Sequence, residues 1–97
     1  MFKTKIIVSG RVQGVGFRYF VIATAQQVGG IYGRVWNNDD GSVGILAQAD
    51  DAEHLNYFIT LIRNGPKRSP FAKVTYLESL PAAFDDFHDF NISYQAY

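Results

Sequence analysis

The sequence has no cysteine, no long apolar run and no excess of charge of either sign, and each absence excludes a class of protein. Without cysteine the chain forms neither a disulfide nor a thiolate metal site. Its purely apolar stretches span a few residues each, far below the roughly 20 residues that a membrane-spanning helix needs. No basic and then apolar leader stands at the N-terminus. We therefore expect a cytoplasmic protein with no membrane partner.

The charges balance overall but not along the chain. Nine Lys and Arg face nine Asp and Glu, for a formal net charge of +0. General nucleic-acid binders carry a basic excess, so we expect no nucleic-acid partner. Residues 1–48 hold five basic side chains and two acidic ones. A small anion, if one is bound, is therefore expected on the first half of the chain.

The chain has enough apolar residues for a compact core. It has 97 residues, of which 47% are hydrophobic and 15% aromatic. A chain of this length buries only about two thirds of the surface that it exposes when unfolded, so its aromatic side chains must be well placed. No repeat, low-complexity tract or linker interrupts the sequence. We expect one domain over residues 1–97.

Apolar periodicity and glycine positions divide the chain into strands and helices. The run Ile6-Ile7-Val8 is apolar on both faces, which is typical of a central strand. The expected elements are, in chain order, a strand over 3–9, a helix over 17–28, strands over 31–37 and 43–47, a helix capped by Asp50 or Asp51 and ended by Gly65-Pro66, and strands over 74–77 and 90–94. This βαββαβ order with an additional C-terminal strand is typical of the ferredoxin-like α/β sandwich of the α+β class, in which two helices cover one face of an antiparallel sheet.

Three glycines within seven residues follow the first strand, at Gly10, Gly14 and Gly16. Glycine tolerates the backbone conformations that turn successive N–H groups inward as an anion nest. The helix that begins at Phe17 directs its free N–H groups and positive dipole end at the same point. Arg18, in the first turn of that helix, adds a cation that can hold two phosphate oxygens. The residues thus predict a small oxyanion site with one guanidinium.

The expected topology brings a second side chain to this site. If the strands over 3–9 and 31–37 run the same way with the strand over 43–47 between them, both end at the same edge of the sheet. They would lie roughly 10 Å apart, at two interstrand spacings. Asn37, at the end of the second strand, would then be a neighbour of Arg18.

A glycine loop alone is a weak signal, and the spacing here is neither that of a Walker A loop nor that of a dinucleotide fingerprint. The longer string GRVQGVGFRYF over residues 10–20, however, strongly resembles the signature of acylphosphatases. The resemblance spans roughly residues 4–94 and continues with Gly33-Arg34-Val35-Trp36-Asn37, with Asp40-Gly41-Ser42-Val43, and with Gly65-Pro66 ahead of Ala72-Lys73-Val74.

The resemblance implies hydrolysis of acyl phosphates to a carboxylate and inorganic phosphate, without a metal, a cofactor or a covalent phosphoenzyme. The family's phosphate-binding arginine corresponds to Arg18, and its water-orienting asparagine corresponds to Asn37. The loop amides that hold the phosphoryl group correspond to Gln13, Gly14, Val15, Gly16 and Phe17. The implied partners are a small acyl phosphate and its product phosphate. We expect a monomer, and dimerisation through an edge strand stays open.

The chain departs from the family pattern near Asn37. Arg34 stands where the family usually has an aromatic residue, and Trp36 stands where it usually has a basic one. Gly44 stands where an acidic residue is common, and Gly29-Gly30 where Leu-Gly is frequent. Because Arg34 and Trp36 lie on the same strand as Asn37, we expect them to affect the wall of the site and its acyl preference.

Two other classes of function remain open. A noncatalytic module would keep the anion site and lose turnover, like the acylphosphatase-type domain of carbamoyl-transfer proteins. An RNA-binding ferredoxin-like domain would need exposed aromatic residues on its central strands. Those strands offer only aliphatic residues, namely Ile6, Val8, Val43 and Ile45.

The remaining polar residues have simpler interpretations. His54 and His88 lie far apart with no third ligand at metal spacing, which favours solvated positions over a metal site. Asp39-Asp40 precedes a glycine and is most simply a turn between two strands. We therefore expect no metal.

Overall fold

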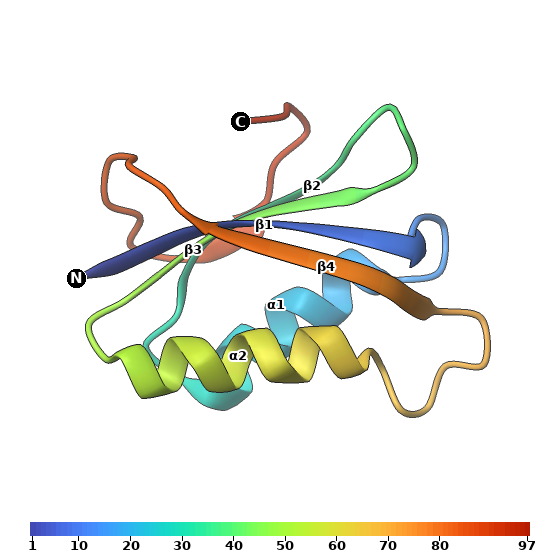
Figure 1. The fold of residues 1–97 in the computed structure, drawn as a ribbon, viewed down its shortest axis with the longest axis horizontal. Coiled ribbons are helices and arrows are strands. Elements are labelled where there is room, and N and C mark those ends of the chain that lie inside the picture. Colours follow the sequence, from blue (N-terminus) through green and yellow to red (C-terminus); the bar gives the residue numbers. More distant parts are fainter.

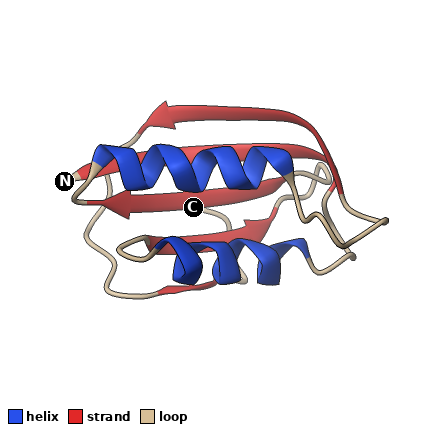
Figure 2. Cartoon of the chain, turned by 90° about the horizontal axis from the view of Figure 1, so that it is seen from below, coloured by secondary structure: helices blue, strands red, loops and turns tan.

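The computed structural model describes residues 1–97 and contains seven elements in the expected order. They are β1 (Phe2–Arg11), α1 (Phe17–Val28), β2 (Tyr32–Asn37), β3 (Val43–Ala49), α2 (Ala52–Asn64), β4 (Lys73–Pro81) and β5 (Phe90–Ile92). Both helices pack on one face of a five-stranded sheet (Figures 1 and 2). This arrangement confirms the predicted ferredoxin-like sandwich.

The strands are arranged in the order β4-β1-β3-β2-β5. The first four are antiparallel neighbours, and β3 lies between β1 and β2 as expected. β5 instead pairs with β2 in parallel, so the sheet is mixed rather than purely antiparallel. β4 and β5 lie at opposite edges of the sheet, so the chain has to cross the sheet between them. Residues 82–89 make this crossing over the helix-free face and enter the sheet beside the start of β2 (Figure 1).

The core lies between the sheet and the helices. Alternation along β1 and β3 directs Ile6 and Ile45 into it, and both are fully buried. From α2, Phe58 fills the space opposite them and is also fully buried. The side chains of the helix face thus form one continuous apolar layer.

The ends of α2 follow from local hydrogen bonding. Asp51, rather than Asp50, is the N-cap, and its carboxylate accepts hydrogen bonds from the backbone N–H groups of Glu53 and His54. Gly65 ends the helix with a φ of 73°, and its N–H donates to the carbonyls of Leu61 and Ile62. Both signals were readable in the sequence because capping needs particular residue types.

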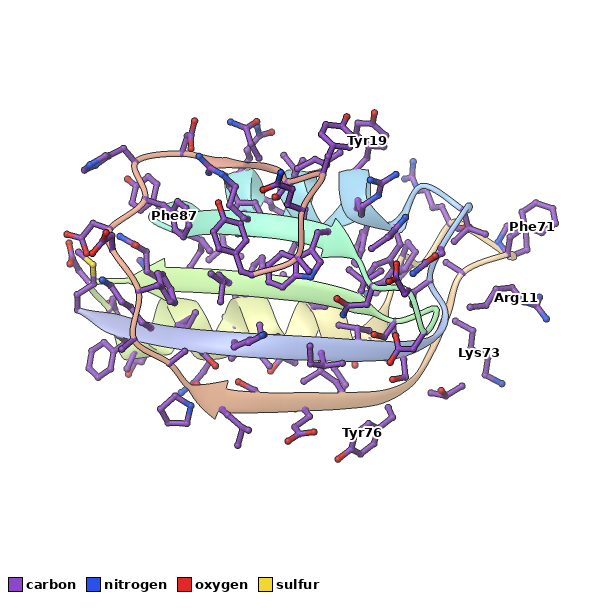
Figure 3. All side chains as sticks on the ribbon, turned by 90° about the horizontal axis from the view of Figure 1, so that it is seen from above. Arg11, Tyr19, Phe71, Lys73, Tyr76 and Phe87 are labelled. Atoms are coloured by element: carbon purple, nitrogen blue, oxygen red, sulfur yellow. The ribbon has the colours of Figure 1, made fainter.

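The helix-free face is covered by the C-terminal part of the chain. We call residues 82–89 and 93–97 the strap. Its aromatic rings form a chain of contacts across this face: Phe84 lies 5.5 Å from Phe87, Phe87 lies 5.9 Å from Tyr97, and Tyr97 lies 5.4 Å from Trp36 of β2. Figure 3 shows Phe87 on this side of the sheet.

Two ion pairs and several hydrogen bonds hold the strap in place. Lys3 Nζ lies 2.7 Å from Asp86, and Arg34 Nη1 lies 2.6 Å from Asp89. Between them, the backbone N–H of Phe87 donates to the buried side chain of Gln48 at 2.8 Å. The face that aromatic side chains would need for base stacking is therefore occupied by the chain itself.

Candidate active site

The loop between β1 and α1 is fixed at both ends and exposed in the middle. Val12 and Phe17 are each 1% exposed and belong to the core, whereas Gly14 and Gly16 face solvent. Both glycines have positive φ, 72° and 78°, and a Cβ at either position would meet no atom within 4 Å. Glycine is required here by the backbone conformation and not by crowding. Gly16 is the N-cap of α1, so the free N–H groups of the first turn open onto the loop.

The side chain of Gln13 ties this loop to the turn between β2 and β3. Its Nε2 donates to the backbone carbonyl of Asn38 at 2.7 Å and to that of Ser42 at 2.8 Å. Both amide protons are thus used on one turn. The sequence suggested only the backbone N–H of Gln13 as a contact. The sequence cannot indicate the partners of the Gln13 side chain, because they are backbone carbonyls of a segment distant in the chain.

A network of short hydrogen bonds shapes the β2–β3 turn. Ser42 donates its backbone N–H and its hydroxyl to Asp40 Oδ1, at 2.9 and 2.6 Å. The hydroxyl of Ser42 also accepts from Asn38 Nδ2 at 3.0 Å, and Trp36 Nε1 donates to Asn38 Oδ1 at 2.8 Å. The hydrogen bonds from Ser42 lower the pKa of Asp40 below its usual value. The expected turn role of Asp40 is confirmed.

Arg18 and Asn37 both lie at this end of the molecule. Arg18 is the second residue of α1 and is half-buried, and Asn37 is the last residue of β2 and is exposed. Asn37 pairs with Val43, a core residue, so its side chain leaves the sheet on the helix face. Neither side chain has a hydrogen-bond or ion-pair partner within the protein. Both are available to a ligand.

No hydrogen bond joins Arg18 to Asn37, and the side chain of Gln13 supplies the link between their segments. The loop that carries Gln13 leads into α1 and Arg18, while the turn that accepts its hydrogen bonds begins at Asn38, next to Asn37. Loop and turn lie at the same end of the sheet, on the right of Figure 1. The resulting site combines free backbone N–H groups, one guanidinium and one carboxamide, which together suit a small tetrahedral oxyanion.

Arg34 and Trp36 do not line this site, which corrects the sequence interpretation. Successive residues of a strand point to opposite faces, so these side chains lie on the helix-free face while Asn37 lies on the helix face. Arg34 binds Asp89 there, and Trp36 is 1% exposed beneath Tyr97. These departures therefore concern the packing of the strap and not the wall of the site.

Trp36 and Gly44, two of the departures from the family pattern, are cross-strand partners. A Cβ at position 44 would lie 2.4 Å from Trp36 Cε2 and 2.6 Å from its Nε1. The indole ring therefore occupies the space that a side chain at position 44 would fill. A large aromatic residue on β2 requires the smallest residue on β3.

The structure contains neither a cluster of metal-ligating side chains nor a helix suited to cross a membrane. No group of three or more His, Cys, Asp or Glu side chains is placed so that it could hold a metal ion. Neither α1 nor α2 has the length and apolar character that crossing a membrane demands.

Comparison with known proteins relates this geometry to one family. The family model Acylphosphatase matches residues 4–92. The acylphosphatase of Lactococcus lactis subsp. lactis (strain IL1403) is 60% identical over 98 residues, covering 97% of this chain and 100% of that protein. The crystal structure of acylphosphatase from Bacillus subtilis is similar with a TM-score of 0.86 and 43% identity, over 97% of this chain and 100% of that chain. The structure of T.kodakarensis HypF is similar with a TM-score of 0.80 and 26% identity, over 100% of this chain and 12% of that chain. The chain belongs to the acylphosphatase family.

Proposed function

We propose that this chain hydrolyses the carboxyl-phosphate anhydride of acyl phosphates. Arg18 and the loop amides of Gln13 to Phe17 hold the phosphoryl group, and Asn37 orients the attacking water. Membership of the acylphosphatase family supports the activity. The observation that carries the assignment to these residues is the double hydrogen bond of Gln13, which joins the anion-binding loop to the turn beside Asn37.

The residues at the site suit a reaction that needs little proton transfer from the protein. The water oxygen forms a bond to phosphorus while the bond from phosphorus to the acyl oxygen breaks. The leaving group is a carboxylate, which departs without a general acid. An oxygen of the phosphoryl group takes the proton of the water, so the products are a carboxylate and inorganic phosphate. Catalysis then consists of positioning the water and stabilising charge on the equatorial oxygens.

The electrostatics of the site favour a doubly charged phosphoryl group. Arg18 has no carboxylate partner that a ligand would have to displace. The N-terminus of α1 adds partial positive charge through its free N–H groups. No acidic residue stands in the first turn of α1 to cancel it.

The test is the hydrolysis of benzoyl phosphate by the chain after treatment with EDTA. We expect turnover in the parent, near-complete loss in Arg18→Ala together with weaker binding of inorganic phosphate, and loss of turnover with phosphate binding retained in Asn37→Ala. Arg63→Ala and Asn56→Ala are the matched controls, because both residues are exposed on α2. Equal loss of phosphate binding in Arg18→Ala and Asn37→Ala would contradict the separate roles.

A noncatalytic phosphate-binding module is the second candidate. The similarity to a segment that makes up 12% of full-length HypF favours it, since that larger protein was crystallised in a phosphate- and nucleotide-bound form. Binding of inorganic phosphate by the folded parent without any turnover of benzoyl phosphate would establish this alternative.

We further propose a single domain over residues 1–97 that acts as a cytoplasmic monomer, without metal, cofactor, nucleic-acid or membrane partner. The edges of the sheet support the monomer. β4, at one edge, carries Lys73, Glu78 and Pro81, which discourage pairing with another strand, and β5, at the other edge, has three residues. Sedimentation equilibrium at several protein concentrations tests whether the chain is a monomer.

A further inference from the structure

The indole N–H of Trp36 begins a chain of hydrogen bonds that runs into the β2–β3 turn. Trp36 Nε1 donates to Asn38 Oδ1 at 2.8 Å, and Asn38 Nδ2 donates to Ser42 Oγ at 3.0 Å. The hydroxyl of Ser42 in turn donates to Asp40 Oδ1 at 2.6 Å. All donors in this chain therefore point in the same direction, from the buried ring toward the carboxylate of Asp40.

The chemistry of the two ends fixes the orientation of the Asn38 carboxamide. An indole N–H is a donor only, so the oxygen of Asn38 must face it. At the other end Asp40, whose pKa the hydrogen bonds from Ser42 lower, is ionised and accepts only. Ser42 gives its hydroxyl proton to this carboxylate, so the amide nitrogen of Asn38 must face Ser42. No other donor in the protein contacts Asn38 Oδ1, so the orientation of the carboxamide depends on Trp36.

Asn38 and Ser42 also carry the carbonyl groups that hold the glycine loop. Gln13 Nε2 donates to these two carbonyls at 2.7 and 2.8 Å. The backbone N–H of Asn38 donates to the carbonyl of Ser42 at 2.9 Å and closes the turn. Asn37 directly precedes Asn38 in the chain. A change in the conformation of Asn38 therefore affects both the loop and Asn37.

Trp36 is held firmly, whereas the tip of the turn is open to solvent. The ring of Trp36 is 1% exposed, lies 5.4 Å from the ring of Tyr97 and has Lys5 Nζ at 5.9 Å from its centre. On β3 only the absence of a Cβ at Gly44 leaves room for it. Residues 39–41, in contrast, are exposed. A close-packed ring has little freedom to rotate, so its N–H is a fixed point against which the turn is held.

We propose that Trp36 is a positioning residue for the attack of water on phosphorus. Its N–H orients Asn38, which fixes the turn that binds Gln13, and so fixes Asn37 relative to the anion-binding loop. Trp36 does not touch the substrate, because its side chain lies on the helix-free face and that of Asn37 on the helix face. This inference rests on the proposed acyl phosphate hydrolysis and adds to it a residue outside the site.

The test removes the N–H of Trp36 and keeps the shape of the ring. Because Trp36 is the only tryptophan, growth of a tryptophan-requiring host on an analogue changes this side chain alone. Benzothienylalanine carries sulfur in place of the N–H, and fluorotryptophan, which keeps the N–H, is the matched control. We expect benzothienylalanine to lower kcat for benzoyl phosphate about five- to 20-fold relative to fluorotryptophan, because misplaced reacting groups react more slowly.

The affinity for inorganic phosphate separates positioning from general damage to the site. It should change little between the two analogue forms, because Arg18 and the loop amides hold the phosphate. Circular dichroism verifies that both forms are folded. An unchanged kcat would overturn the proposal, and so would a loss of phosphate affinity as large as the loss of kcat.

The same comparison in an Asn38→Ala background tests the route through Asn38. This variant has no carboxamide for the N–H to orient, so its two analogue forms should have the same kcat. Effects of residues that act through one hydrogen-bond network are not additive. If benzothienylalanine lowered kcat as strongly in Asn38→Ala as in the parent, the ring would act by another route and the proposal would be wrong.

Hydrogen exchange of the Gln13 side chain separates this inference from the proposed hydrolysis. Gln13 Nε2 is hydrogen-bonded to both carbonyls of the turn, so exchange of its protons with solvent, measured by nuclear magnetic resonance, reports a loosened turn. We expect faster exchange with benzothienylalanine than with fluorotryptophan. Equal exchange rates would overturn the role of Trp36. The expected difference in a chain that does not hydrolyse benzoyl phosphate would support that role and count against the proposed function alone.

Discussion

Replacing Gly44 by alanine perturbs the contact between β3 and Trp36. The new Cβ would lie 2.4 to 2.6 Å from three atoms of the indole ring. The ring is 1% exposed and lies against Tyr97 at 5.4 Å, so it has little room to move. Overpacking of this kind costs about 1–3 kcal/mol. Loss of the hydrogen bond from Trp36 to Asn38 adds about 0.5–1.5 kcal/mol.

Replacing a glycine also has an effect that raises the free energy of unfolding. Alanine has less conformational freedom to lose on folding, which offsets about 0.5–1 kcal/mol. We therefore expect Gly44→Ala to lower the free energy of unfolding by about 0.5–4 kcal/mol. Urea titrations followed by far-ultraviolet circular dichroism measure this change. Tryptophan fluorescence cannot replace circular dichroism here, because Trp36 is the only tryptophan and the variants that lack it, described next, would give no signal.

A double-mutant cycle with Trp36→Leu separates this clash from a general loss of stability. Leucine leaves room above position 44, so alanine should cost little in that background. The double variant should be more stable than the sum of the two single changes predicts, by about 1–3 kcal/mol. Additive effects, within about 0.5 kcal/mol, would show that the ring and the glycine are not coupled and would refute the reasoning.

Three further predictions concern the loop and the strap. Gln13→Leu should lower kcat for benzoyl phosphate about 10- to 100-fold, with a smaller effect on phosphate affinity, because a shift of the loop relative to Asn37 misplaces the water; steady-state kinetics and calorimetry with phosphate measure the two effects. Hydrogen bonding to Arg34 lowers the pKa of Asp89 below its usual 3.8, so its stabilisation is present above that pH and is lost as the pH falls through the lower folded-state value. Urea midpoints should thus fall less in Asp89→Asn than in the parent between about pH 6 and about pH 3. Tyr97→Ala should destabilise the fold by about 0.5–1.5 kcal/mol for each of its two aromatic pairs, with Trp36 and Phe87, and should shift the fluorescence of the newly exposed Trp36 to longer wavelength.

The sequence was informative where one residue type satisfies a local backbone requirement. Glycine at positive φ marked the loop at Gly14 and Gly16, and the carboxylate of Asp51 marked the start of α2. The positions of Arg18 and Asn37 followed from the strand order, which the βαββ pattern strongly restricts. These features depend on short stretches of chain or on topology.

The features that the sequence did not predict depend on contacts between distant segments. The parallel pairing of β5 is set by the path of residues 82–89, which carry no periodic pattern. The partners of the Gln13 side chain are carbonyl groups, which every residue has. The orientation of Trp36, in contrast, follows from strand alternation relative to Asn37, and strict application of that period would have placed it on the helix-free face.

The strap also determines the order in which the molecule can be completed during synthesis. Lys5 donates a hydrogen bond to the carbonyl of Tyr97, 92 residues later, and Lys3 pairs with Asp86. β1 is an inner strand of the sheet, yet one of its two neighbours, β4, is made near the end of the chain. Because closing such long loops costs entropy before any contact repays it, we expect slow folding for a chain of this length. The edge of β1 that pairs with β4 stays unpaired until residues 73–81 have been synthesised. Until then this edge can pair with strands of other chains.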